Sequence, residues 1–142
     1  VANFILGMCQ SSSSGEGVMI KYVYDDDSHG QSEYFQYPLE TLYLRTGDCE
    51  DTAILYCTIA SYMGLDICMY LFSNHIAAGV YLEEFTPSST VNSSIYKGVY
   101  YLTDDEKPYY YCETTGKNWH VGDVWKEEAE NYYYWDIPVG EY

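Results

Sequence analysis

The spacing of apolar residues changes at Gly64, and this change restricts the folds that the chain can adopt. Before Gly64, apolar residues recur every three or four positions, as they do on one face of a helix. The residues concerned are Ala53, Tyr56, Ala60 and Met63. After Gly64, two continuous apolar runs of strand length follow at residues 67–72 and 75–82. A helix followed by antiparallel strands predicts an α+β fold.

Both ends of the predicted helix carry suitable capping residues. Asp48 fits the N-cap position, and Asp51 three residues later approximates a capping box. Gly64 fits the position after the last helical residue, where a left-handed backbone is common. We therefore predict a helix over residues 49–63, with Cys49 in its first turn on the packed face.

The remaining segments complete a prediction of one domain over residues 1–142. Residues 73–74 are expected to form the turn of the first hairpin, and residues 95–102 and 109–115 to form a second hairpin. Four further expectations are the end of a helix over 1–10, a short strand or extended arm over 18–24, a turn-rich stretch over 25–36 and a short strand near 132–135. The chain lacks an initiator Met, so we expect a domain cut from a longer exported or cell-surface protein.

The charge of the chain excludes several classes of partner. Six basic residues face 22 acidic residues, which gives a formal net charge of -16. Such a surface repels phosphate backbones and anionic lipid surfaces, so no nucleic-acid partner is expected. No apolar run approaches the roughly 20 residues that cross a bilayer as a helix, so no membrane insertion is expected.

The five cysteines point to one reactive thiol and not to a metal site. No two of them have the CxxC spacing of a zinc knuckle, and their odd number argues against a complete disulfide framework. We expect no metal and no cofactor. Most lie in apolar stretches and are expected to be buried. The lack of a pairing pattern among the five cysteines favours a reducing or anoxic setting. The full set is Cys9, Cys49, Cys57, Cys68 and Cys112.

Cys49 differs from the other cysteines because it opens the predicted helix. The positive end of the helix dipole favours the thiolate, which is the nucleophilic form. Three acidic neighbours, Asp48, Glu50 and Asp51, oppose a further negative charge. A cationic partner is therefore needed, and an imidazolium is the natural candidate.

His75 and Glu113 are the best candidates to complete a catalytic triad. His75 starts a strand directly after a turn, which is a rigid position, whereas His29 and His120 lie in predicted loops. Strand alternation puts Glu113 on one face with Tyr109 and Tyr111, where a carboxylate is best explained by a buried partner. Such a carboxylate would orient the imidazole.

Three sequence blocks resemble those of the transglutaminase-like superfamily. They are Gly47-Asp48-Cys49-Glu50-Asp51, Asn74-His75-Ile76-Ala77-Ala78-Gly79-Val80 and Tyr111-Cys112-Glu113-Thr114-Thr115. The resemblance covers roughly residues 37–124 and is similar to uncharacterised archaeal and bacterial members. It implies a papain-like core, a Cys49, His75 and Glu113 triad, and amide chemistry on a peptide or protein substrate through a thioester. Glu replaces the more frequent Asp, and no aromatic residue adjoins Cys49, unlike in animal transglutaminases.

Several questions stay open at the level of sequence. We favour hydrolysis over crosslinking, since no site for an acceptor amine is recognisable. A catalytically silent peptide-binding or protein-binding module is the main alternative, and a metal site using His75, Glu113 and a cysteine is a weaker one. Gln10 at the end of the first helix could donate to an oxyanion. Arg45 is expected to pair with a carboxylate and fix the loop before Cys49.

Overall fold

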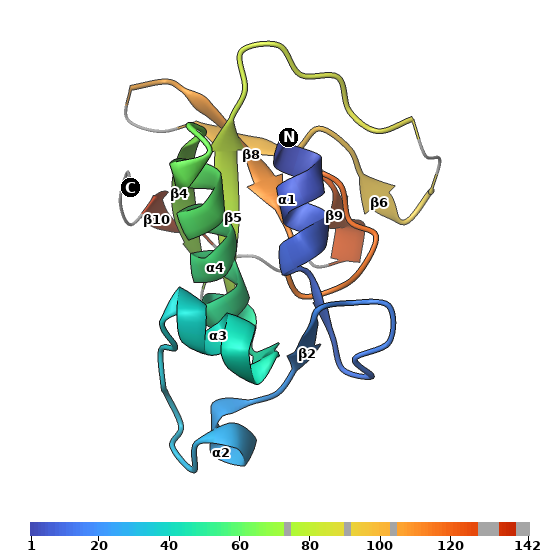
Figure 1. Ribbon diagram of the computed structural model, residues 1–142. Helices are drawn as coiled ribbons and strands as arrows, with labels where there is room; N and C mark the ends of the chain where they lie inside the picture. Colours follow the sequence, from blue (N-terminus) through green and yellow to red (C-terminus); the bar gives the residue numbers. More distant parts are fainter. Residues whose placement is uncertain (73–74, 90–91, 103–104, 128–133, 139–142) are drawn as a thin grey trace.

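A five-stranded antiparallel sheet forms the centre of the protein. The computed structural model describes residues 1–72, 75–89, 92–102, 105–127 and 134–138. The strand order is β10-β4-β5-β8-β7. The bounds are β4 Asp66–Phe72, β5 His75–Tyr81, β7 Tyr100–Leu102, β8 Pro108–Cys112 and β10 Tyr134–Pro138. Helices α1 (Ala2–Cys9) and α4 (Cys49–Tyr62) lie side by side over one face of this sheet (Figure 1). The α+β fold class is confirmed.

Smaller elements surround this core. Strands β1 (Ser11–Ser12), β2 (Ile20–Tyr22) and β3 (Thr46–Gly47) form a parallel sheet beside the start of α4. Strands β6 (Ile95–Tyr96) and β9 (Val124–Trp125) form an antiparallel pair. Helices α2 (Asp25–Ser28) and α3 (Pro38–Leu44) join β2 to β3 and lie at the N-terminal end of α4 (Figure 1).

Helix α4 begins and ends where its capping residues predict. The Asp48 side chain accepts from the backbone N–H of Asp51, and the Asp51 side chain accepts from the backbone N–H of Asp48. Gly64, two residues past Tyr62, has the left-handed φ of +82° that ends such a helix. The prediction of a helix over residues 49–63 is therefore confirmed within one residue.

Two helices were not expected in the stretch before Cys49. The short α2 lies within the segment that was predicted to be turn-rich, and α3 follows it. Pro38 occupies the first turn of α3, and the Glu40 side chain accepts from the backbone N–H of Tyr37. Proline at a helix start together with a glutamate at the third position is a recognisable N-terminal signal.

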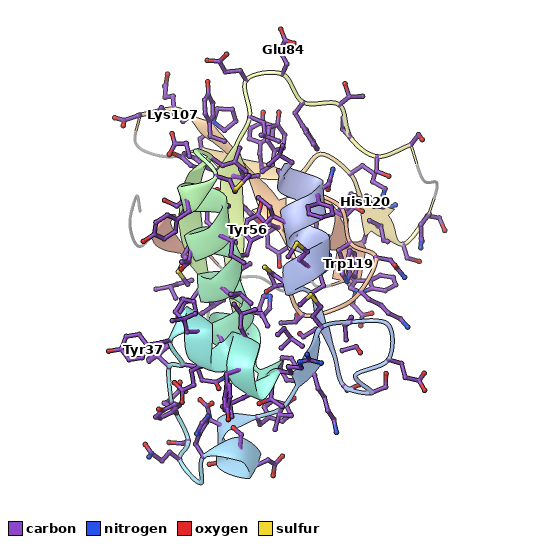
Figure 2. The ribbon with its side chains drawn as sticks, viewed as in Figure 1. Tyr37, Tyr56, Glu84, Lys107, Trp119 and His120 are labelled. Carbon is purple, nitrogen blue, oxygen red and sulfur yellow. The ribbon has the colours of Figure 1, made fainter. Side chains whose placement is uncertain are left out.

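The sheet alternates between two buried clusters, as period-two patterning requires. One face packs against α1 and α4 through Ile67, Met69, Ala78, Val80 and Cys112. The other face contributes Cys68, Tyr70, Ala77, Tyr109 and Tyr111, which pack with Val124. Many tyrosines therefore serve as core residues, and Tyr56 of α4 is fully buried within the structure (Figure 2).

The two predicted hairpins have different outcomes. Strands β4 and β5 pair in register from Asp66 opposite Tyr81 to Phe72 opposite His75, so the first hairpin is confirmed. Its predicted turn at 73–74 lies outside the described residues. Strands β7 and β8 pair as the second hairpin predicts.

The prediction of one strand over residues 95–102 is wrong. The chain turns at Gly98, where φ is +65°, so β6 leaves the main sheet and pairs with β9. The predicted final strand is present as β10, which pairs with β4 from Tyr134 onward. Residues 132–133 of that prediction lie outside the described part of the chain.

Candidate active site

His75 and Glu113 lie in contact at neighbouring strand ends. His75 opens β5, and Glu113 follows β8, which pairs with β5 through Ala78 opposite Cys112. Nε2 of His75 is 3.2 Å from Oε2 of Glu113, and both side chains are largely buried. The sequence therefore identified a histidine and a carboxylate that the fold brings together across 38 positions of the chain.

Hydrogen-bond donors around Glu113 stabilise its ionised carboxylate. Tyr111 donates its hydroxyl to Oε2 at 2.6 Å, and Thr115 donates its backbone N–H and its hydroxyl to Oε1 at 3.0 Å and 2.7 Å. Burial by itself raises the pKa of this carboxyl. The hydrogen bond and charge of His75, with the donors of Tyr111 and Thr115, outweigh burial and lower the pKa to about 2.

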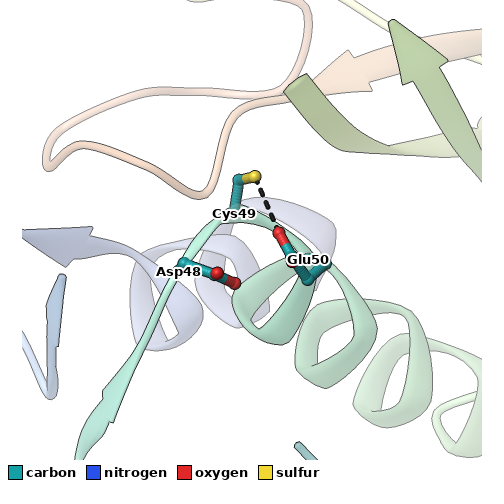
Figure 3. A group of neighbouring side chains, drawn as sticks. All are labelled: Asp48, Cys49 and Glu50. Atoms are coloured by element: carbon teal, nitrogen blue, oxygen red, sulfur yellow. Dashed lines mark hydrogen bonds between the residues drawn. The ribbon is translucent and has the colours of Figure 1, made fainter. Parts of the chain in front are cut away.

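The Cys49 thiol lies at the first turn of α4 and points toward an acceptor. Its sulfur donates to Oε2 of Glu50 at 3.0 Å (Figure 3). Burial, and then the hydrogen bond to Glu50, raise the pKa of the Cys49 thiol to about 12. The backbone N–H of Ile76, the residue after His75, faces the sulfur and acts in the opposite direction. Cys49 is therefore a neutral thiol at rest, beside the strand that carries His75.

Hydrogen bonds fix the segment that carries Glu113 against both long helices. The backbone N–H of Ser11, just after α1, donates to the carbonyl of Thr114 at 2.8 Å. The hydroxyls of Thr114 and Thr52 are 2.8 Å apart, and Thr52 lies in the first turn of α4. The acid-bearing segment and the start of the Cys49 helix therefore have a common buried anchor.

Gln10 lies close to this anchor, but its amide is already engaged. Its Nε2 donates to the backbone carbonyl of Trp119 at 2.8 Å and to that of Glu113 at 3.3 Å. Two carbonyl acceptors use both protons of an amide nitrogen. The observed role of Gln10 is to join the end of α1 to the segment after β8, and its oxyanion role stays a prediction.

Two further expectations from the sequence concern the cysteines and Arg45. All five cysteines are free, and the four other than Cys49 are buried. Within the described residues Arg45 forms no ion pair and is exposed, so the expected pairing is wrong. Arg45 instead ends α3 in a left-handed conformation, and its carbonyl accepts from Lys21 in the adjacent strand.

A second histidine–carboxylate pair lies next to a cavity of about 440 Å³. Nδ1 of His120 is 3.3 Å from Oδ2 of Asp123, whose other oxygen is 2.9 Å from Nζ of Lys97. Trp119 and His120 are adjacent along the chain beside α1 (Figure 2). The same cavity is lined in part by Glu113, so it adjoins the acid of the His75 pair.

Acidic side chains at the start of α4 could also hold a metal ion. Asp48, Cys49 and Glu50 each offer one ligand atom, and these atoms lie within 4.8 Å of one another (Figure 3). Ligand atoms of Asp25, Asp48 and Asp51 also lie within 4.8 Å of one another, and so do those of Asp25, Glu33 and Glu50. No metal was expected from the sequence, because no two cysteines have CxxC spacing, and these acidic residues were not considered as ligands.

Three residues of the site were not assigned a role from the sequence. Tyr111 and Thr115 donate to Glu113, and Glu50 accepts from Cys49. Tyr111 and Thr115 could have been predicted as partners of Glu113, because an extended chain puts residues two positions apart on one face. The direction of the Glu50 side chain depends on the tertiary packing around α4 and could not have been predicted in this way.

Comparisons with known proteins give no family assignment. No family model matches this chain, and no curated protein matches it. The fold and the site define an α+β protein with a buried histidine–carboxylate pair beside a helix-opening cysteine. In the part of the chain that the structure describes, no helix has the length and apolar character needed to cross a membrane.

Replacing Glu50 is expected to make Cys49 more reactive. Glu50→Gln removes the charged acceptor of the thiol, so the thiol pKa should fall. Each unit by which the thiol pKa falls gives about tenfold more thiolate. The alkylation rate rises only about threefold, because the nucleophilicity of the thiolate also falls. We expect alkylation by iodoacetamide at pH 8, with a chelator present, to rise about threefold or more, as measured by peptide mass spectrometry. Exposed Glu16→Gln should leave the rate unchanged, and an unchanged rate in Glu50→Gln would contradict the prediction.

Proposed function

We propose that this chain is a transglutaminase-like cysteine enzyme that hydrolyses peptide or isopeptide amides through a thioester on Cys49. The observation that carries the proposal is the 3.2 Å contact between His75 and buried, ionised Glu113. It occurs at the start of β5, where the next residue, Ile76, faces the Cys49 sulfur. A papain-like core is part of the proposal, supported by α4 packed on an antiparallel sheet.

The proposed reaction uses the two nitrogens of His75 differently. Nε2 faces Glu113, so the neutral imidazole carries its proton there and Nδ1 accepts the proton of Cys49. The thiolate attacks the amide carbon, and the tetrahedral intermediate collapses to a thioester. The leaving amine takes the proton back from His75. Water, deprotonated by His75, then releases the carboxylic acid and restores the thiol.

The raised thiol pKa favours this general-base route over a resting ion pair. At neutral pH almost all Cys49 is protonated, because burial and then the hydrogen bond to Glu50 stabilise the thiol. Proton transfer to His75 must therefore accompany attack on the substrate. Glu113 keeps the imidazole oriented and stabilises its positive charge once the proton has moved.

The direct test is to trap the acyl group on Cys49. The purified chain is incubated with p-nitrophenyl acetate and with a Lys–Gln isopeptide-linked peptide, then quenched in acid and digested for mass spectrometry. We expect an acyl mass on the peptide that contains Cys49, followed by its loss to water, and no such mass in Cys49→Ser. Acylation on other cysteines only, or none from either donor, would refute the enzyme proposal. Added methylamine separates hydrolysis from transamidation by the product that accumulates.

A catalytically silent peptide-binding or protein-binding module is the second candidate. The specific observation in its favour is that Cys49 donates to Glu50, which stabilises the unreactive form of the thiol. This candidate predicts saturable peptide binding with no covalent intermediate. The acid-quench experiment therefore distinguishes the two candidates directly.

A further inference from the structure

Four acidic side chains are buried together at the start of α4. Asp25, Asp48, Glu50 and Asp51 are each no more than 6% exposed. Among the described residues, neither lysine nor arginine forms an ion pair with any of them. Carboxylates that are removed from water without a positive partner are costly, so this cluster requires a proton or a cation.

Two overlapping groups of carboxylates each have a spacing that fits a metal ion. Asp25, Asp48 and Asp51 offer oxygens within 4.8 Å of one another, and Asp25, Glu33 and Glu50 do the same. Calcium–oxygen distances are about 2.4 Å, so two ligands on opposite sides of one ion lie about 4.8 Å apart. Asp25 belongs to both groups and is the residue that links them.

Two buried acceptor atoms at this place lack a donor. Oδ2 of Asp25 accepts from the backbone N–H of Tyr34 at 2.6 Å, whereas its Oδ1 has no hydrogen-bond partner among the described residues. The same holds for Oε1 of Gln36, whose amide nitrogen donates to Oδ2 of Asp51 at 2.7 Å. Both side chains are only 3% exposed. Buried acceptors without partners are rare, and a cation satisfies them where no donor is present.

We propose that a hard divalent cation, Ca²⁺ or Mg²⁺, binds in this cluster between α2 and the first turn of α4, with Asp25 as its central ligand. Carboxylate and amide oxygens select hard ions over soft ones. The Cys49 sulfur is turned toward Glu50 and is not required as a ligand. The positive end of the α4 dipole opposes a cation, but its charge of about half a unit is smaller than that of the carboxylates. The site would fasten the segment at 25–36 to the nucleophile helix.

A proton is the competing way to neutralise the cluster. Burial, with Glu50 beside it, raises the pKa of the Asp48 carboxyl to about 8. Burial also raises the pKa of Asp25, and the hydrogen bond from the backbone N–H of Tyr34 acts against that rise. Protonation of Asp48 leaves Oδ1 of Asp25 without a partner, which is why the cation is the better account. The inference concerns binding alone and does not rest on the proposed enzymatic function.

Isothermal titration calorimetry tests the proposal on the complete chain. The protein is treated with a chelator, dialysed, and titrated with CaCl₂ and with MgCl₂ in about 0.15 M KCl, which screens its surface charge. We expect one ion per chain with a Kd between about 10⁻⁶ and 10⁻³ M for at least one of the two metals. Asp25→Asn should weaken binding at least tenfold, because it removes a charge while leaving an oxygen for Tyr34.

Matched variants distinguish cation binding at a defined site from nonspecific attraction to the acidic surface. Asp27→Asn makes the same charge change in the same short helix at an exposed position, so binding should stay within twofold of the parent chain. Glu50→Gln is the second variant and should also weaken binding at least tenfold. Cys49→Ser should leave binding intact. No saturable binding below about 10 mM, or equal weakening by the Asp25 and Asp27 variants, would overturn the proposal.

Discussion

His75→Ala is expected to slow acylation of Cys49 by p-nitrophenyl acetate by about 10²–10⁴-fold, the usual contribution of a general base. The effect should be large because the thiol has a pKa of about 12 and cannot ionise by itself near neutral pH. His75 directly precedes Ile76, whose backbone N–H faces the Cys49 sulfur. Glu113 holds the His75 imidazole in place. The rate is read from acetylated Cys49 peptide in single-turnover samples.

His75→Gln distinguishes loss of the base from loss of packing. Its amide can still donate to Glu113 but cannot accept the thiol proton, so it should slow acylation as much as His75→Ala does. His120→Ala is the matched control, because His120 also pairs with a carboxylate, that of Asp123 at 3.3 Å. The His120 variant should keep the parental rate. Equal slowing by both alanine variants would show that His75 has no special role.

Glu113→Ala is expected to destabilise the fold by about 3–5 kcal/mol, because each buried donor that loses its acceptor costs about 1–3 kcal/mol. The substitution leaves the hydroxyls of Tyr111 and Thr115 and the ring of His75 without their acceptor. Urea unfolding monitored by circular dichroism measures the change. Asp66→Ala is the control, since Asp66 also accepts from a tyrosine and a lysine but is 38% exposed, and it should cost about 1 kcal/mol.

The pH profile gives a second signature of Glu113. Its pKa falls from an ordinary 4.5 to about 2 on folding, so the ionised form stabilises the native state above the unfolded pKa. As pH falls from about 4.5 to about 2, roughly 3 kcal/mol of stability should be lost. Glu113→Ala should lack this component of acid unfolding. An unchanged acid limb in the variant would contradict the assigned ionisation.

Asp48 should make the folded state less stable as pH rises, which is the opposite of the effect of Glu113. Its pKa is raised to about 8 by burial and by Glu50, so the native state holds a proton that the unfolded chain has lost. Stability should therefore decrease as pH rises from about 4 to about 8 in the presence of a chelator. Together the two groups predict greatest stability in mildly acidic solution.

Some of the fold was predictable because the information is local. Asp48 and Asp51 cap α4 through residues three positions apart, and Gly64 ends the same helix. Strand alternation assigned Tyr109 and Tyr111 to one buried face before any pairing was known. Proline at the start of α3 was an equally local signal, although the spacing of apolar residues did not predict this helix.

The chemistry-bearing residues were also partly predictable. Cys49 stood out because acidic neighbours surround a cysteine at a helix start, and Glu113 because it ends an apolar strand. Their types and positions suggested a triad, and the fold brings His75 and Glu113 to hydrogen-bonding distance. The expected pairing of Arg45 is not found among the described residues, where α3 ends at Arg45 and its side chain is exposed.

By itself, the sequence determined the long helix, the alternating strands and the identity of the candidate catalytic residues, since each depends on neighbours within about four positions. Only the tertiary structure decided that Gln10 bonds to the carbonyls of Glu113 and Trp119, more than 100 positions away. It also decided that Asp25 joins the acidic cluster at the start of α4. Such contacts depend on how whole elements pack, and local preferences along the chain do not specify that packing.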